Sequence, residues 1–259
     1  MLGEPIYSEA RSMMKCLVIG LLLLVSVQVA TAVAAPGQVT VLSSNGYLNS
    51  VGYYHVVGEV QNTGSSTVAS VLVTATYYTS GNTLLGTSSS QTMIGILEPG
   101  RKSPFDIALN DLLQSARTHH YELAVTYGQS PSLPLGLQVV SSTKKVDSAG
   151  YLHISGTIKN NGSAIAHETK VAATFYDSAG KVVDAALSYS DPTDINGGAK
   201  ASFEIMILEK QRVGLVSSYS LEAESVEYGT IPEFTSALLI LPVVVLLALI
   251  LMRRRAIPV

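Results

Sequence analysis

One sequence unit occurs twice in this chain, and no other feature constrains the fold as strongly. When the sequence is shifted by 98 positions, identical residues align without a gap over most of the unit. They include Gly58, Asn62, Gly64, Tyr78, Gly100 and Phe105, which meet Gly156, Asn160, Gly162, Tyr176, Gly198 and Phe203. This period is the length of a whole small domain and is too long for a solenoid repeat. We therefore predict two tandem domains, residues 37–134 and residues 135–230.

Apolar and polar residues alternate with a period of two inside each unit. In the segment HVVGEVQN, Val56, Gly58 and Val60 share one face, and HISGTIKN repeats the pattern in the second unit. Such alternation predicts antiparallel strands that are buried on one side and wet on the other. The predicted fold is therefore all-β: two tandem antiparallel β-sandwich domains of about seven strands each.

Two kinds of turn sequence recur between the predicted strands. Asn62-Thr63-Gly64 and Asn160-Asn161-Gly162 predict strand ends with positive φ, which Asn and Gly adopt at little cost. Glu98-Pro99-Gly100 predicts a type II turn, because proline presets φ and glycine takes the left-handed position. Asn196-Gly197-Gly198 meets the same need in the second unit. Between the termini, we expect a short helical turn only in residues 111–118.

The strand and turn sequences resemble those of the FxLyD domain family. The resemblance rests on GEVQNTG at 58–64, TYY at 76–78 and LEPG at 97–100 in the first unit, and on GTIKNNG at 156–162 and TFYD at 174–177 in the second. It implies an extracellular, immunoglobulin-like β-sandwich of bacterial and archaeal surface proteins. The family has no assigned catalytic residues, so the resemblance implies none here.

Residues 1–35 are predicted to be a secretory signal peptide that forms a helix. Lys15 precedes an apolar run at 16–35, which ends in the small-residue patterns Ala30-Thr31-Ala32 and Ala32-Val33-Ala34. This order of a basic residue, an apolar stretch and an A-x-A pattern predicts cleavage after Ala32 or Ala34. The alternative is an uncleaved N-terminal anchor.

Residues 231–259 are predicted to contain a transmembrane helix with a basic tail. The run 234–252 carries no charge, and as a helix its 19 residues would span roughly 28 Å, close to the hydrocarbon thickness of a bilayer. Arg253, Arg254 and Arg255 follow at once, and positive charge stays on the cytoplasmic side. These arginines set the topology: the C-terminus faces inward and residues 37–230 face outward.

Pro232, Glu233 and Phe234 stand directly before the apolar run. The order of motif, apolar run and basic cluster resembles the PEF-CTERM sorting signal of archaeal proteins. The resemblance implies that a membrane-embedded archaeosortase recognises the motif and removes the tail. The alternative is an ordinary retained anchor. Both alternatives predict a cell-surface location at the membrane.

Charge and cysteine content exclude several classes of function. Between residues 37 and 232 the chain has 11 Lys and Arg against 16 Asp and Glu, a net charge of −5, which disfavours nucleic acid as a partner. Cys16 is the only cysteine, so we expect no disulfide and no thiol chemistry. The sequence also lacks a Gly-x-Ser-x-Gly elbow and a glycine-rich phosphate loop. We predict no catalytic residues, no cofactor and no enzyme activity.

Histidine and aspartate residues are the candidate metal ligands, and we interpret both groups as solvated. His55 and His153 occupy equivalent outward positions without further ligands nearby in the sequence. Asp184, Asp191 and Asp194 surround a turn in the second unit, but their spacing matches no calcium loop. We therefore predict no metal site.

Two surface features remain as candidates for recognition or modification. Tyr78 and Tyr176 lie on the predicted outer face of equivalent strands, where tyrosine could support recognition, although simple β-propensity or burial under a neighbouring strand is the favoured explanation. Asn161 begins the sequon Asn161-Gly162-Ser163 in a predicted exposed turn, which makes it a candidate glycosylation site.

Together these features predict a non-catalytic cell-surface protein that displays two β-sandwich interaction modules. Its role would be adhesion, envelope structure or partner binding. The predicted partners are the membrane, an archaeosortase-like processing enzyme, and other envelope proteins or glycans. The alternative is a single-pass accessory or ligand-binding subunit of a membrane complex.

Overall fold

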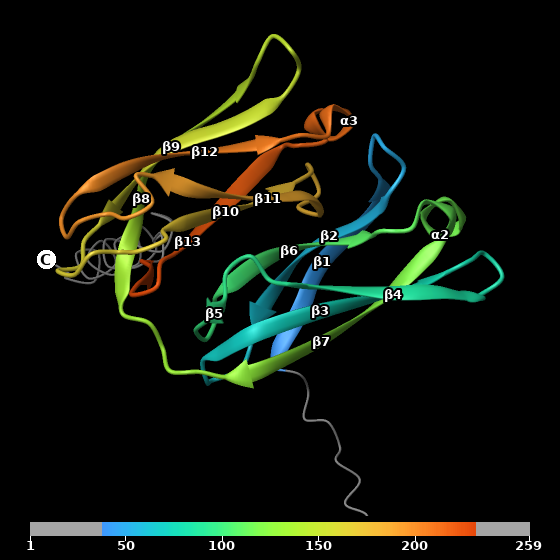
Figure 1. Ribbon diagram of the computed structural model, residues 1–259, viewed down its shortest axis with the longest axis horizontal. Helices are drawn as coiled ribbons and strands as arrows, with labels where there is room; N and C mark the ends of the chain where they lie inside the picture. The colour runs from blue at the N-terminus through green and yellow to red at the C-terminus, as the bar shows by residue number, and fades with distance from the viewer. Residues whose placement is uncertain (1–37, 232–259) are drawn as a thin grey trace, which may run out of the picture. The chain divides into compact units, whose positions relative to one another are not determined.

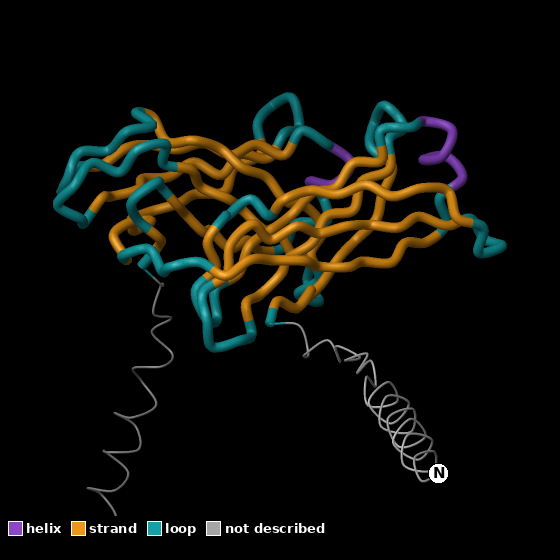
Figure 2. Tube along the Cα trace, turned by 60° about the horizontal axis from the view of Figure 1, so that its bottom comes forward, coloured by secondary structure: helices purple, strands orange, loops and turns teal. Residues whose placement is uncertain are grey.

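The structure is a computed structural model that describes residues 38–231. This part of the chain is all-β, as predicted: strands joined by turns, with two short helices (Figure 2). The predictions for residues 1–35, for Pro232, Glu233 and Phe234, and for the apolar run and arginines that follow lie outside the described residues. Within 38–231, neither helix has the length and apolarity needed to cross a bilayer.

Each sequence unit, which we now call a repeat, forms strands in the same order, except that β5 occurs only in the first repeat and β14 only in the second (Figure 1). The first repeat comprises β1 (Val39–Leu48), β2 (Tyr54–Asn62), β3 (Val68–Tyr78), β4 (Leu84–Gln91), β5 (Ile96–Leu97), β6 (Lys102–Leu109), α2 (Leu112–Arg117) and β7 (His120–Gln129). The second comprises β8 (Leu135–Val146), β9 (Leu152–Asn160), β10 (Lys170–Tyr176), β11 (Val182–Asp191), β12 (Lys200–Ile207), α3 (Lys210–Val213), β13 (Ser218–Glu224) and β14 (Gly229–Thr230). The predicted helical turn at 111–118 is confirmed by α2, which Asp111 caps through a 2.9 Å hydrogen bond from Gln114 N.

The first repeat consists of two sheets around one apolar core. One sheet has the order β1-β2-β6, and in the other β3 pairs with β4, β5 and β7. Buried side chains from both sheets form a single cluster that includes Val56, Val60, Phe105, Val73 and Tyr77. Burial of this apolar surface is the main favourable term that holds the two sheets together.

The second repeat differs from the predicted sandwich, because its strands close into a barrel in the order β10-β11-β12-β9-β8-β14-β13. Closure depends partly on the pairing of Ser190 and Asp191 with Phe203 and Ser202. The positions equivalent to Asp191 and Ser202 are Met93 and Pro104 in the first repeat. There Met93 N donates to Pro104 O at 2.9 Å, but proline has no N–H to return the bond. The first repeat therefore stays open at this point.

The predicted positive φ in the turns after β2 and β9 is wrong. None of the Asn and Gly residues in these turns has a positive φ: Asn62, Gly64, Asn160 and Gly162. Instead, each asparagine is fully buried and bonds through its side chain. Asn160 Nδ2 donates to the carbonyls of Ala164 and Ile195 at 2.8 Å, and its Oδ1 accepts from Gly162 N at 2.8 Å. Asn62 makes the equivalent bonds in the first repeat.

The predicted turn at Glu98-Pro99-Gly100 is present. Arg101 N donates to Glu98 O at 2.9 Å, and Gly100 has a φ of 84°. This positive φ at the third position is the conformation of a type II turn and favours glycine. Gly198 has a φ of 78° in the equivalent turn of the second repeat.

Strand β2 also departs from the prediction of one buried and one wet face. Val57 and Glu59 point away from the core of the first repeat, yet they are only 0% and 2% exposed. They are buried because β11 of the second repeat packs on this side of the β1-β2-β6 sheet. The repeats thus share an interface, and a candidate site lies in it.

Candidate functional site

The interface between the repeats has a small apolar centre. Val57 from β2 packs with Val182 and Ala185 from β11, and Tyr47 and Met93 contribute partly buried surface. Ser43 Oγ accepts a 3.1 Å hydrogen bond from Val182 N beside this centre. Strand β11 is therefore held against the first repeat by both apolar contact and backbone bonding.

Glu59 is a buried carboxylate whose partners come from both repeats. Tyr176 Oη donates to Glu59 Oε1 at 2.6 Å, and Lys102 Nζ lies 3.1 Å from Glu59 Oε2. Burial, followed by the hydrogen bond to Glu59, raises the pKa of the Tyr176 hydroxyl. The structure thus supports burial under a neighbouring element for Tyr176. Its equivalent Tyr78 instead stacks on His120, with ring centroids 5.1 Å apart.

Arg101 joins the first repeat to two strands of the second. Its side chain is 7% exposed, and Nη1 donates to Glu98 Oε2 at 3.1 Å. Nε donates to Glu222 Oε2 at 3.2 Å, and Nη2 donates to Ala223 O at 2.6 Å and to Thr230 Oγ1 at 3.2 Å. Burial raises the pKa of Glu222, while the Arg101 charge acts in the opposite direction. The guanidinium therefore compensates the charge of a carboxylate that is only partly buried, with a side chain 28% exposed.

Glu224 provides a second buried polar contact between the repeats. Its two carboxylate oxygens accept hydrogen bonds from Gly95 N and Ile96 N, each at 2.9 Å. Lys170 Nζ lies 3.1 Å from Glu224 Oε1 within the second repeat. A backbone segment of the first repeat is thus bound by a side chain of the second.

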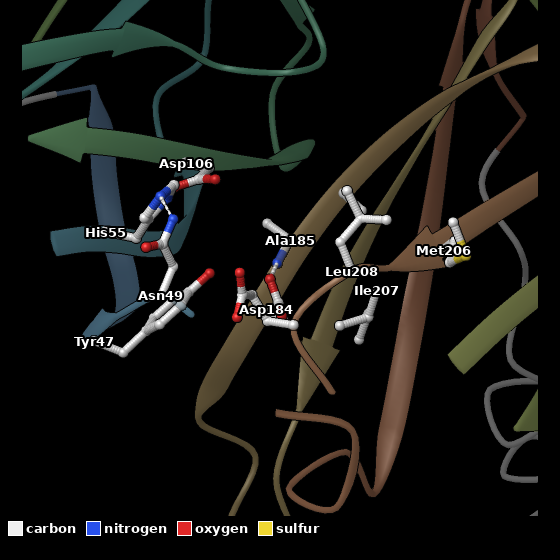
Figure 3. A pocket seen from close by; sticks show the side chains of 11 residues that line it. Tyr47, Asn49, His55, Asp106, Asp184, Ala185, Met206, Ile207 and Leu208 are labelled. Atoms are coloured by element: carbon white, nitrogen blue, oxygen red, sulfur yellow. Dashed lines mark hydrogen bonds and ion pairs between the residues drawn. The ribbon is translucent and has the colours of Figure 1, made fainter. Parts of the chain in front are cut away.

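A cavity of about 260 Å³ lies at another part of the same interface (Figure 3). The first repeat contributes polar side chains to its wall, and the second contributes apolar side chains and two carboxylates. The lining residues are Tyr47, Asn49, His55, Asp106, Asp184, Ala185, Ala186, Met206, Ile207, Leu208 and Glu209. We call this space the inter-repeat cavity.

Asp184 is the most buried charged group in the cavity wall, at 6% exposed. Its Oδ1 accepts a 2.8 Å hydrogen bond from Ala185 N, and its Oδ2 lies 3.8 Å from Arg212 Nε. Arg212 donates from Nε and Nη2 to Val183 O, and its guanidinium lies 3.8 Å from the Tyr47 ring centroid. Burial raises the pKa of Asp184 to about 6, although the Ala185 bond and the Arg212 charge both oppose the shift.

His55 lines the cavity, and both of its ring nitrogens are hydrogen-bonded. The interpretation of this residue as a solvated histidine was therefore wrong. Nδ1 lies 2.8 Å from Asp106 Oδ1, and Nε2 lies 3.1 Å from Asn49 Nδ2. The ring stacks on Tyr47 at a centroid distance of 5.5 Å. The Asp106 hydrogen bond raises the pKa of His55 against the effect of burial. Its equivalent, His153, pairs with two carboxylates outside the cavity.

The three aspartates of the second repeat do not converge. Asp184 faces the cavity, whereas Asp194 Oδ1 accepts a 3.0 Å hydrogen bond from Glu168 N in a turn, and Asp191 is exposed at the end of β11. In residues 38–231, no three His, Cys, Asp or Glu side chains are grouped as a metal site would require. Asn161 is exposed, and its Nδ2 donates to Gln138 Oε1 at 3.0 Å.

Sequence reasoning missed Arg101, Arg212 and Glu209, although comparison of the repeats contained a signal. A shift of 98 places uncharged residues at the equivalents of many interface charges. Glu59, Arg101, Asp184, Arg212, Glu222 and Glu224 correspond to Thr157, Ala199, Gly86, Gln114, Ala124 and Thr126. Charges present in one repeat only are expected where the repeats face each other, because each repeat uses a different surface there.

Comparisons with known proteins gave no family for this chain. No protein-family model and no curated protein matches it. A transglutaminase from red sea bream is 10% identical with a TM-score of 0.24, and the match covers 75% of this chain and 30% of the enzyme. An exo-chitosanase, CsxA from Amycolatopsis orientalis, is 12% identical with a TM-score of 0.26, covering 73% and 26%. This chain spans less than a third of either enzyme's length, and neither similarity bears on its activity.

Proposed function

We propose that this chain is a non-catalytic cell-surface protein that displays its two repeats as one rigid unit. We take each repeat to be an immunoglobulin-like sandwich of the FxLyD type. In the second repeat, the two sheets have closed into a barrel. The displayed faces serve adhesion, envelope structure or the binding of envelope proteins and glycans. Export depends on the predicted signal peptide at 1–35, and attachment depends on the C-terminal segment at 231–259.

The contacts of Arg101 carry this proposal. One buried guanidinium bonds the first repeat, β13 and β14. Strand β14 also pairs with β8, and Ile231 N donates to Leu137 O at 2.7 Å. Ile231 directly precedes Pro232 in the sequence. An attachment beyond Ile231 would therefore be mounted on a strand that both repeats hold, which suits a module that must keep its orientation at a surface.

Processing of the tail is the more specific part of the proposal. Pro232, Glu233 and Phe234 would be recognised by an archaeosortase-like enzyme, with Arg253, Arg254 and Arg255 retained on the cytoplasmic side until cleavage. Asn161 is proposed as a glycosylation site, because its sequon lies on an exposed turn.

Intact-mass measurement on the protein recovered from the membrane fraction of producing cells tests both steps. We expect a mature N-terminus after Ala32 or Ala34 and loss of the segment that follows the Pro232-Glu233-Phe234 motif. A double variant, Pro232→Ala with Phe234→Ala, should retain the tail. If the natural protein keeps Arg253, Arg254 and Arg255, the tail is a permanent anchor. An unprocessed protein in the cytosol would contradict export.

The inter-repeat cavity favours a second candidate, a ligand-binding subunit with a retained anchor. A cavity with charged and apolar walls at the junction of two repeats is where small ligands commonly bind. The same mass measurement separates the two candidates, since only the second requires an intact tail.

A further inference from the structure

The inter-repeat cavity has two chemically distinct walls (Figure 3). Asp106, Asp184 and Glu209 supply carboxylates, whereas Met206 and Leu208 supply an apolar surface at the end of β12. Leu208 lines the cavity and is 67% exposed, so a ligand bound in the cavity could cover it. A ligand that is cationic at one end and apolar at the other would satisfy both walls.

Asp184 leaves one acceptor unused in this cavity. Its Oδ2 has no hydrogen-bond donor among residues 38–231, because Arg212 Nε is 3.8 Å away and donates to Val183 O instead. Yet the residue is only 6% exposed. Among residues 38–231 no buried side-chain oxygen lacks a partner, so Oδ2 is open to the cavity and can be hydrated there. A ligand donor would take the place of that water.

The other polar groups in the wall restrict the kind of cation. Asp106 is already bonded to His55, and both oxygens of Glu209 accept bonds from Ser50, from its N at 3.0 Å and its Oγ at 3.1 Å. A divalent metal needs several free ligands that converge at short range, and the described residues offer no such group. An ammonium group has three N–H donors, and it can donate one to a carboxylate oxygen and the others to water in a negatively charged surrounding.

The charges around the cavity provide that surrounding. Three carboxylates line it, and Arg212 adjoins Asp184 as a compensating cation, so the negative charge is in excess when His55 is neutral. The volume of about 260 Å³ is below the range of drug-sized sites and therefore suits a small ligand.

We propose that the inter-repeat cavity binds a small primary ammonium ion with a short alkyl body. The ammonium donates to Asp184 Oδ2, and the alkyl body covers Met206 and Leu208. The inference does not depend on how the chain is anchored or processed. It stands on the cavity, the unused oxygen and the apolar wall.

Isothermal titration of the purified full-length protein with n-butylammonium chloride at pH 7.5 tests the proposal, with sodium chloride matched for ionic strength. We expect saturable binding in the millimolar range, weaker binding of methylammonium, and no binding of n-butanol, which lacks the charge. Equal affinity for n-butanol, or no saturation up to about 50 mM, would overturn it.

A pair of variants separates the cavity from general surface charge. Asp184→Asn keeps the side-chain shape and should weaken n-butylammonium binding by about tenfold, the loss typical of a hydrogen bond to a charged group. Asp191→Asn removes an exposed carboxylate on the same strand that does not line the cavity, and it should leave the affinity unchanged. Equal effects of the two variants would show non-specific attraction only and would refute the site.

Discussion

At the scale of single residues, the most informative side chains are those that the two repeats share. Asn62 and Asn160 are both fully buried, and each bonds two carbonyls and one amide around its own turn. The sequence showed the identity of these positions, but it suggested a backbone role through positive φ. The side-chain amide explains the identity better, because no other residue of this size offers two donors and an acceptor together.

Replacing Asn160 by alanine should destabilise the protein. The carbonyls of Ala164 and Ile195 and the amide of Gly162 would lose their partners, at a cost of about 2–4 kcal/mol in the free energy of unfolding. Urea unfolding followed by circular dichroism would measure it. The neighbouring exposed Asn161→Ala is the matched control and should change stability by less than about 0.5 kcal/mol. Equal stability of both variants would contradict the assigned role.

Asp184 and His55 predict how stability depends on pH. The pKa of Asp184 is raised to about 6 in the folded protein, so its burial penalty is relieved as the pH falls from about 6 towards 3.8. The raised pKa of His55 changes stability in the same direction. Its contribution to stability is present below pH 6.5 and is lost as the pH rises through the folded-state pKa.

Stability should therefore be higher at pH 5.0 than at pH 7.5, with about 1 kcal/mol coming from Asp184. Thermal unfolding at the two pH values would measure the difference. The Asp184→Asn variant should lose this part of the difference, and the control Asp191→Asn should keep it. A wild type that is less stable at pH 5.0 would disprove the assignment.

At the scale of elements, the two repeats use the same strand pairs with small differences of closure. Gly58 pairs with Phe105 and Gly156 pairs with Phe203 in the same register. A Cβ atom at Gly58 would lie 2.3 Å from the Phe105 ring, so glycine is required where the ring crosses the strand. Pro104 lacks the N–H that would complete a pairing between β4 and β6. Among residues 38–231, no strand of the first repeat joins β1 to β7 as β14 joins β8 to β13 in the second.

At the scale of the whole molecule, the repeats behave as one unit because buried charges cross between them. Glu59, Arg101 and Glu224 each bond to the other repeat. Removing one partner of such a buried pair leaves the other charge without compensation. The resulting loss of folding free energy is larger than the stabilisation that the intact pair provides. The interface is therefore specific to this arrangement of the repeats.

Arg101→Ala should loosen the interface, although alanine is the residue found at the equivalent position, Ala199. It would leave the partly buried Glu222 without its cation, and Ala223 O and Thr230 Oγ1 without a donor. We expect this to cost about 2–3 kcal/mol in the free energy of unfolding. Hydrogen exchange at Gly95 N and Ile96 N, which bond to Glu224 of the second repeat, should accelerate. Arg117→Ala, on the exposed face of α2, is the control. Unchanged exchange in Arg101→Ala would exclude its role as the joint.

The sequence by itself determined the period-two strands, the turn at Gly100, the helical turn at 111–118 and the equivalence of the two repeats. These depend on residues close together in the chain or on identity at a constant offset. The barrel closure, the inter-repeat cavity and the partners of Arg101 and Asp184 were decided only by the tertiary structure. They arise where residues that are distant in the chain meet in space, and alternation along a strand does not show what covers its outer face.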